Sequence, residues 1–294
     1  MVTLQIEHQT VYRYTRPVEF GRHRLVIRPR EGHDVRVVQL TLDICPSHQL
    51  IWSRDVFGNS IALVDFLQPA DRLEIRSAVV VQRSLPFSAE AHHARWKQPF
   101  PVVYDPLETI AASCYQAVSY PDDAAALRSW LNEALPYPDH TDAEATAAAL
   151  NIAVNRRIKY LRRSERGVQS PAQTLQLGSG SCRDMATLLM DAARVLGFAT
   201  RFASGYLDCA ASIAGRASTH AWTEFYLPLL GWRGFDPTLG EPTSLKHVVT
   251  GVSNHPRGVM PVSGLFNGTS NDYLDMTVTV KTEHIPCGRE GLAS

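Results

Sequence analysis

The order of hydrophobic and polar residues predicts two structurally different regions. Through residues 1–85, apolar and polar positions alternate, which is typical of strands that bury one face. Turn signals rich in proline and glycine separate the alternating stretches, as in a small antiparallel sandwich or barrel. The predicted strands cover residues 4–14, 25–27, 35–44, 60–66 and 73–81. We therefore predict an all-β, sandwich-like N-terminal domain at residues 1–85.

The pattern then changes to one of helices. Residues 86–105 contain several prolines and little periodicity, so we predict a linker there. Apolar residues at helical spacing follow at 106–118, 122–135 and 141–158. Asp122 and Thr141 are the predicted N-caps of the last two helices, and Thr141 would form a capping box with Glu144.

A strongly apolar helix and several strands complete the chain. The helix spans residues 182–197, and strands are predicted at 200–206, 220–227, 232–236 and 272–281. Helices followed by antiparallel strands are typical of the α+β class. We predict that residues 106–294 form one α+β domain, which includes the C-terminal strand.

Charge and hydropathy exclude several classes of protein. Lys plus Arg and Asp plus Glu both total 29 in the 294 residues, a balance that argues against a dedicated nucleic-acid binder. A basic run at residues 155–163 is interpreted as the solvated end of a helix, with a patch for an anionic partner as the alternative. No stretch approaches the ~18 consecutive apolar residues of a membrane helix, and the N-terminus lacks the order of a signal peptide. We therefore expect a cytoplasmic protein without nucleic-acid or membrane partners, of open oligomeric state.

The five cysteines indicate free thiols. Their number is odd, they are scattered, and no two form a CxxC pair, so we expect neither a disulfide framework nor a structural zinc site. His92 and His93 have no ligand at metal-binding spacing, and no loop carries the clustered acidic residues of a calcium site. We expect no metal and no cofactor. The cysteines are Cys45, Cys114, Cys182, Cys209 and Cys287.

Cys182 differs from the other four cysteines in its position. It follows a turn that contains Gly178 and Gly180, and it begins the apolar helix, whose few polar side chains form one narrow stripe. At a helix start, the positive end of the backbone dipole favours a thiolate, and free N–H groups can stabilise an oxyanion. A buried structural cysteine is the alternative, but it requires neither the glycines nor a helix start. We therefore predict that Cys182 is a nucleophile.

A predicted hairpin supplies a base and an acid. Alternation through residues 220–227 places His220 and Trp222 on one face and the intervening residues on the core face. If the turn is centred at Pro228, His220 lies opposite Asp236 at about 5 Å. A carboxylate there would orient the imidazole and stabilise its protonated form. The predicted proximity of His220 and Asp236 depends on this register, and a bulge or a different register would separate the two side chains.

Three segments carry a resemblance to a known family. They are GSGSCRDMATLLMDAARVLGFATRFASGYL, STHAWTEFYLPLLGWRGFDPT and an N-terminal pattern like HxTxYxYxxPV at residues 8–18. Together they resemble the transglutaminase-like superfamily of papain-like thiol enzymes, and in particular its bacterial two-domain members with cysteine-protease-like sequences. The resemblance implies a papain-like core, in which a buried helix with the cysteine packs on an antiparallel sheet. It makes Cys182 the nucleophile, His220 the base and Asp236 the orienting acid.

Two other residues are weaker candidates for this site. Gln176 stands six residues before Cys182, a papain-like spacing for a second oxyanion donor, although the backbone N–H of Cys182 is the better candidate. Trp222 is predicted to face the same side as His220, where it would shield the ion pair from water or simply fill the core.

These residues predict a cysteine-dependent acyl transfer on peptide or side-chain amides, through a thioester. Transfer to water would make the protein a protease or amidase, whereas transfer to an amine would make it a crosslinking transglutaminase; deamidation is a further alternative. Hydrolysis is favoured because no segment indicates an amine-binding site. A non-catalytic binding or scaffold module is the rival from another class, and loss of one triad residue would mark it. A redox thiol would require neither His220 nor Asp236.

Overall fold

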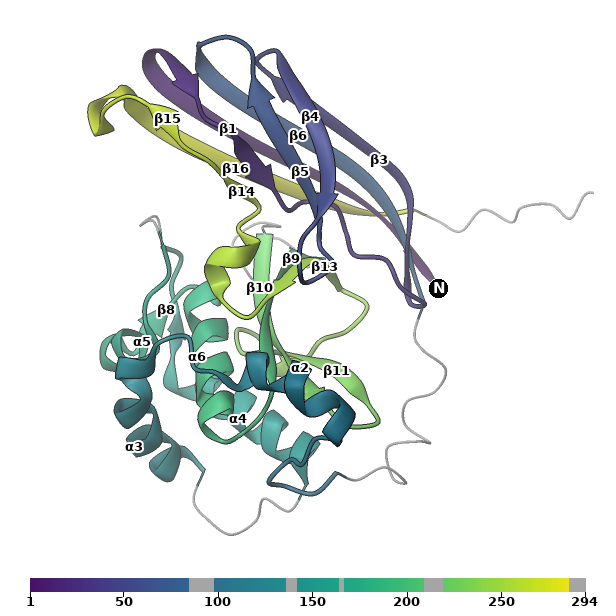
Figure 1. The fold of residues 1–294 in the computed structure, drawn as a ribbon, viewed down its shortest axis with the longest axis vertical. Coiled ribbons are helices and arrows are strands. Elements are labelled where there is room, and N and C mark those ends of the chain that lie inside the picture. Colours follow the sequence, from purple (N-terminus) through teal and green to yellow (C-terminus); the bar gives the residue numbers. More distant parts are fainter. Residues whose placement is uncertain (85–97, 136–141, 164–166, 209–218, 286–294) are drawn as a thin grey trace, which may run out of the picture.

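The computed structural model describes residues 1–84, 98–135, 142–163, 167–208 and 219–285. Strands make up one half of the molecule, and helices around a further sheet make up the other (Figure 1). The predicted linker lies largely outside the described residues, as do His92, His93, Cys209 and Cys287. Within the described ranges, no helix has both the length and the apolar character needed to cross a membrane.

The strand-rich N-terminal region predicted from the alternating pattern is confirmed. It contains β1 (Val2–Phe20), β2 (His23–Leu25), β3 (Val35–Cys45), β4 (His48–Arg54), β5 (Ser60–Phe66) and β6 (Ala70–Arg83). The strands form two antiparallel sheets, one with β1 between β6 and strands from the end of the chain, the other with β5 between β2 and β4. The sequence pattern missed β4 because its apolar residues 50–52 are consecutive, and Ile51 and Trp52 are exposed.

The C-terminal strands belong to these same sheets. They are β14 (Val262–Ser263), β15 (Phe266–Asn267) and β16 (Tyr273–Ile285), and β16 runs antiparallel to β1 from Thr3 to Tyr14. In Figure 1 the yellow β16 accordingly lies beside the purple β1. The sequence-based boundary at 106–294 kept this strand in the second domain. The structure corrects that assignment, since strand pairing over long sequence separations leaves no local signal.

The second region surrounds a five-stranded antiparallel sheet with the order β12-β11-β10-β9-β13. Asp142 is the N-cap of α4, and its carboxylate accepts a hydrogen bond from the Ala145 N–H at 2.8 Å. The predicted cap, Thr141, lies outside the described residues. Asp122 lies in a short 3₁₀ turn, and Asp123 precedes α3. The elements are α2 (Pro106–Gln116), α3 (Ala124–Ala134), α4 (Ala143–Arg157), β7 (Lys159–Tyr160), α5 (Pro171–Leu177), β8 (Ser179–Gly180), α6 (Cys182–Val195), β9 (Thr200–Leu207), β10 (Thr219–Leu227), β11 (Gly231–Asp236), β12 (Glu241–Pro242) and β13 (His247–Ser253).

Helix α6 is the centre of this region's core. Its side chains from Asp184 to Arg194 are all buried, in agreement with the apolar sequence of the predicted helix. The Thr223 hydroxyl of β10 donates to the Ala186 carbonyl of α6 at 2.8 Å, and Thr200 of β9 does the same to Met190 at 3.0 Å. These bonds fix the helix along two strands of the sheet. The papain-like arrangement expected from the resemblance, a buried cysteine helix on an antiparallel sheet, is therefore present.

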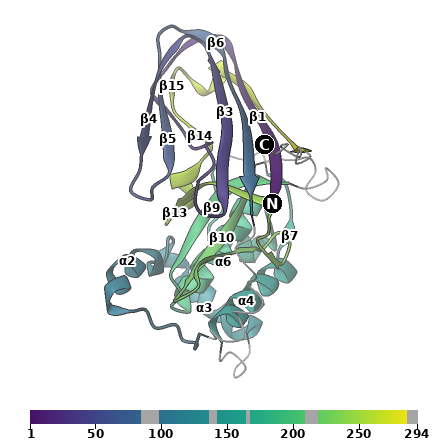
Figure 2. The ribbon, with the colours of Figure 1, turned by 90° about the vertical axis from the view of Figure 1, so that its right-hand side faces the viewer.

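The two regions lie directly against each other (Figure 2), and their side chains share a common core. Leu4 and Ile6 of β1 pack with Tyr206 of β9 and Val248 of β13. The side chain of Asn59, which is fully buried, donates to the Val252 carbonyl and accepts from the Val252 N–H. It thus satisfies the backbone groups of β13 that a neighbouring strand would otherwise pair with. The strand-rich region therefore holds β9 and β13 in place.

Candidate active site

Cys182 is the first residue of α6, as the sequence predicts. The preceding residue, Ser181, is the N-cap, and Oδ2 of Asp184 accepts hydrogen bonds from both its N–H and its hydroxyl at 2.8 Å. The Cys182 N–H has no carbonyl acceptor within the helix, because it belongs to the first turn. The sulfur therefore lies beside a backbone donor at the positive end of a long buried helix.

A buried carboxylate fixes this helix start. Asp184 is fully buried, and its Oδ1 accepts from the Gln169 N–H at 2.8 Å and from the Arg163 guanidinium at 2.9 Å. Its charge is thus compensated by Arg163 and by the helix dipole. Asp184 holds the cysteine turn in place rather than facing the thiol.

His220 and Asp236 meet on neighbouring strands, although the predicted register is wrong by two residues. The pairs run from Thr223 opposite Phe235 to Leu227 opposite Gly231, so the hairpin is centred one residue after Pro228. The turn therefore has three residues between the last paired positions, and Gly231 takes a φ of 74° that favours glycine. An even shift keeps every side chain on its predicted face. His220 Nε2 consequently lies 2.7 Å from Asp236 Oδ2.

The imidazole of His220 interacts with both the Asp236 carboxylate and the Cys182 thiol. His220 is buried, and burial lowers its pKa, but hydrogen bonds to Asp236 and Cys182 outweigh this effect and raise the pKa from 6.5 to about 10. Burial raises the pKa of Asp236, yet the hydrogen bonds from His220 and His247 hold it well below its usual range. The imidazole therefore donates through Nε2 to a carboxylate and has Nδ1 left for the sulfur.

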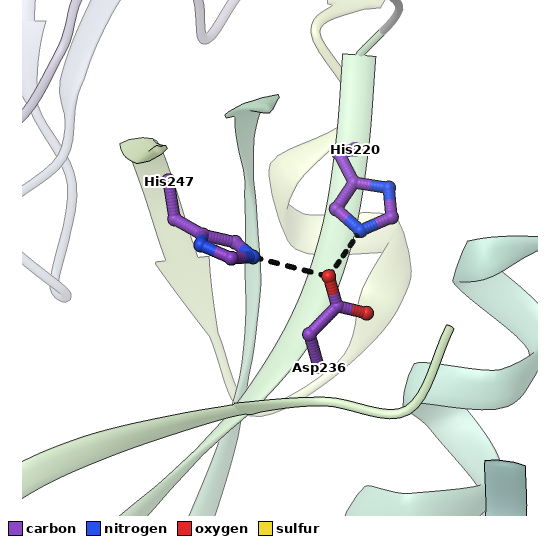
Figure 3. A group of neighbouring side chains, drawn as sticks. All are labelled: His220, Asp236 and His247. Atoms are coloured by element: carbon purple, nitrogen blue, oxygen red, sulfur yellow. Dashed lines mark hydrogen bonds and ion pairs between the residues drawn. The ribbon is translucent and has the colours of Figure 1, made fainter. Parts of the chain in front are cut away.

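His247 is a third member of this group that the sequence did not indicate (Figure 3). Its Nε2 lies 3.0 Å from the same Asp236 oxygen, and its Nδ1 accepts from the Ser244 N–H at 3.1 Å. The Ser244 bond fixes the tautomer, since Nδ1 accepts and Nε2 must carry the hydrogen. His247 therefore donates to Asp236 and holds its carboxylate toward His220.

The same three side chains have the composition of a metal site. Their ligand atoms lie within 4.8 Å of one another, which is close enough for one ion. A histidine ligand needs a lone pair toward the metal and usually donates through its other nitrogen. In His247, Nδ1 accepts from the Ser244 N–H, so Nε2, the nitrogen that faces the other two side chains, carries the hydrogen and has no lone pair for a metal. The group fits a hydrogen-bond network and does not fit a metal centre.

Trp222 and Gly205 complete the surroundings of the pair. The Trp222 ring is 1% exposed and contacts the His247 ring edge-on, with centroids 5.1 Å apart. Gly205 of β9 pairs with His220, and a methyl group there would lie 2.0 Å from the Val248 carbonyl oxygen. The close approach of β9 and β13 therefore requires glycine at this position. Trp222 is thus buried against His247, whereas Gln176 is exposed on α5 and does not line the cleft.

A cavity of about 230 Å³ connects the thiol with the strand-rich region. Cys182 and His220 lie on one wall, and His8, Thr10 and Tyr12 of β1 lie on another. The N-terminal HxTxY pattern therefore contributes to the cleft, a role that its sequence alone did not indicate. A second cavity, of about 450 Å³, lies between β3 and β4 and is lined by no nucleophile or base. The cleft with the thiol is the candidate active site.

Comparisons with known proteins identify the families of both regions. Residues 4–82 match the family described as the bacterial transglutaminase-like N-terminal region, and residues 120–237 match the transglutaminase-like superfamily. The chain belongs to the transglutaminase-like superfamily. Its matched core contains Cys182, His220 and Asp236, but ends before His247.

Two proteins are similar to this transglutaminase-like chain over nearly its whole length. The uncharacterized protein ML0607 of Mycobacterium leprae is 24% identical over 285 residues, which cover 95% of this chain and 99% of that protein. The crystal structure of a candidate cysteine protease from Cytophaga hutchinsonii superposes with a TM-score of 0.73 at 15% identity. It covers 96% of this chain and 90% of the other. Both regions of the fold therefore recur together in another solved protein.

Proposed function

We propose that this protein is a cysteine-dependent amide hydrolase that acts on peptides or proteins. The observation that carries the proposal is the continuous chain from the Cys182 thiol through His220 to Asp236, at the start of a buried helix. Such an arrangement activates a nucleophile and orients its base. It does so beside a cleft large enough for a peptide side chain.

The first half-reaction forms a thioester. The Cys182 sulfur attacks the amide carbonyl carbon, and a C–S bond forms while the carbonyl π-electrons move to the oxygen. The Cys182 backbone N–H at the helix start stabilises the resulting oxyanion. His220 donates its proton to the leaving nitrogen, the C–N bond breaks, and the amine departs. Asp236 keeps the imidazole oriented and stabilises its protonated form.

The second half-reaction returns the enzyme to its starting state. His220 takes a proton from a water molecule, whose oxygen attacks the thioester carbon. The C–S bond breaks, a carboxylic acid is released, and the proton on His220 pairs again with the Cys182 sulfur. An amine in place of water would give a crosslink by the same steps.

The charge of the cleft supports water over lysine as the acceptor. Its lining residues include Arg162, Arg163 and Arg183, and among these described residues there is no Asp or Glu. Like charges repel a lysine ammonium from such a cleft. Hydrolysis is therefore the preferred outcome of the common thioester.

A peptide-library digest tests the proposal. The full-length protein is incubated with the library, with and without an added primary amine, and the products are identified by mass spectrometry. We expect new carboxyl termini or deamidated side chains that are absent with Cys182→Ala. Amine adducts in place of acids would indicate a transglutaminase. Identical spectra for the wild type and Cys182→Ala would overturn the enzymatic proposal and favour a binding module.

A further inference from the structure

The basic side chains of the cleft occupy fixed positions around the thiol. Arg183 directly follows Cys182 in the first turn of α6. Arg162 lies in a segment that runs parallel to the cysteine turn, since the Lys159 N–H bonds to the Gly178 carbonyl at 2.9 Å. The Leu161 N–H bonds in the same way to Gly180 at 2.8 Å. The basic run at residues 155–163 therefore ends at the active-site cleft.

Only one of the three arginines is neutralised within the described part of the chain. Arg163 pairs with the buried Asp184 at 2.9 Å, as described above. Neither Arg162 nor Arg183 makes an ion pair or a side-chain hydrogen bond with a described residue. Within the described residues, the cleft thus carries two guanidinium groups beside the nucleophile that have no anionic partner.

The position of Arg183 is unfavourable for folding. A cation in the first turn faces the positive end of the helix dipole, where an acidic side chain would be stabilising. Asp184, the next residue, has the stabilising charge. A guanidinium at this place, with no partner in the described structure, would attract the same anion as the helix dipole.

The remaining walls of the cleft do not offset this charge. His8 is buried, which lowers its pKa to about 4 and leaves it uncharged near neutral pH. The side of the cleft formed by β1 and β16 has no charged side chain among its described lining residues; Thr10 and Tyr12 lie there beside apolar side chains, and the lining also includes Phe202, Val259, Met260, Met276 and Val278. The cleft is therefore cationic on the helix side and uncharged on the side of β1 and β16.

We propose that the cleft binds substrates with a carboxylate close to the scissile amide, held by Arg162 and Arg183. The proposal rests on the acyl transfer proposed for Cys182 and specifies its substrate class. The carboxylate comes either from an acidic side chain or from the C-terminus of a short peptide. Guanidinium groups recognise both through paired N–H donors.

Alkylation of Cys182 by anionic and neutral reagents tests the arginines without a known substrate. Iodoacetate and iodoacetamide differ in charge but place their reacting carbon similarly, and mass spectrometry gives the rate at each cysteine. Because His220 also attracts an anion, the rate ratio of the wild type alone does not isolate the arginines. Their contribution is the change in the iodoacetate-to-iodoacetamide rate ratio at Cys182 between the wild type and the R162Q/R183Q variant. We expect this variant to lower the iodoacetate-to-iodoacetamide rate ratio by about tenfold at low salt, and by less at high salt.

Controls separate the two proposals. The exposed Arg128 on α3 provides the matched variant R128Q, which should leave the ratio unchanged. The exposed Cys45 and Cys114 provide internal references. A Cys182 no more reactive toward iodoacetamide than these would contradict the proposed function. A reactive Cys182 whose ratio is the same in R162Q/R183Q, and in both single variants, would overturn the carboxylate site.

Three chloroacetyl probes identify the source of the carboxylate. They carry the glutamine amide, which is neutral, the glutamate amide, which has a side-chain carboxylate, and the glutamine free acid, which has a C-terminal carboxylate. Faster reaction of the glutamate amide than of the glutamine amide, lost in R162Q/R183Q, indicates an acidic side chain. Faster reaction of the free acid, lost in the same variant, indicates a peptide C-terminus. No arginine-dependent advantage for either anion would contradict the proposal.

Discussion

Asp236 is the residue on which the candidate site most depends. Its carboxylate is fully buried, a condition that is costly for a charge unless every oxygen is hydrogen-bonded. One oxygen accepts from two imidazoles, and the other accepts from the Thr238 N–H at 2.9 Å. The charge is thus stabilised from three elements of structure at once: His220 of β10, His247 of β13 and the turn that follows β11.

The titration of this pair predicts how stability depends on pH. The His220 pKa is raised from 6.5 to about 10, so its contribution is complete below pH 6.5 and is lost as pH rises through 10. The Asp236 pKa is depressed, so its contribution is present above pH 3.8 and is lost in acid. Asp236→Asn should therefore lower the free energy of unfolding by about 3 kcal/mol at pH 7. Urea denaturation gives the unfolding free energy at pH 7 and at pH 10.5. Its decrease between these two pH values should be smaller in Asp236→Asn than in the wild type, whereas equal decreases would contradict this account.

His247 is predicted to be a positioning residue. His247→Ala removes a hydrogen bond to a buried carboxylate, a loss of ~1.5–3 kcal/mol, and should slow Cys182 alkylation by about tenfold. Since a less constrained Asp236 raises the His220 pKa less, the alkaline limit of amide hydrolysis, which needs protonated His220, should move to lower pH. His247→Gln retains an N–H donor and should restore both. A slower rate with an unchanged pH profile would show a structural role alone.

Single residues were predictable from sequence where the signal was local. The glycine turn, the helix start and the alternating strand lie next to Cys182 and His220, and Asp236 follows within the same hairpin. His247 stands in an ordinary strand and reaches Asp236 only because β13 pairs with β9. Arg162 and Arg183, which have no ion-pair partner among the described residues, could not be recognised as such from the sequence, since pairing depends on contacts such as the one between Arg163 and Asp184.

At the scale of elements, β13 links the two regions of the molecule to the active site. It carries His247, and the Arg83 guanidinium of β6 donates to the His247 carbonyl and to the Ser244 carbonyl. Asn59 holds the far end of the same strand through Val252. The sequence predicted most strands of both regions, but not β13 or the pairing of β16 with β1. Hairpin faces were predictable from alternation, whereas the register depended on the conformation of one turn.

Asn59 is predicted to be essential for the placement of β13. Asn59→Ala leaves the Val252 N–H and carbonyl without partners in a buried position and should cost about 2–4 kcal/mol of unfolding free energy. Chemical denaturation checks the value. Asn132→Ala, at an exposed site on α3, is the matched control and should change it by less than about 0.5 kcal/mol. A neutral Asn59→Ala would contradict the bridging role.

At the scale of the whole molecule, the strand-rich region forms one wall of the cleft and part of the core of its neighbour. Such a shared core predicts that both regions unfold together. Ile6→Ala should lower the unfolding free energy by about 2–5 kcal/mol without separating the transition into two. Hydrogen exchange at increasing denaturant should give one midpoint for β5 and α6. Two midpoints, or an equal effect of the exposed Val38→Ala, would argue against a shared core.

The central claim is that the helix start, the His220–Asp236 hairpin and the cleft together make the Cys182 sulfur an activated nucleophile. The most direct measurement is the rate of iodoacetamide alkylation at each cysteine of the native protein as a function of pH. The account predicts that Cys182 reacts at least about tenfold faster than Cys45 and Cys114 near neutral pH, and that His220→Ala removes this advantage. Equal rates at all three cysteines, or a Cys182 rate that is unaffected by His220→Ala, would contradict it.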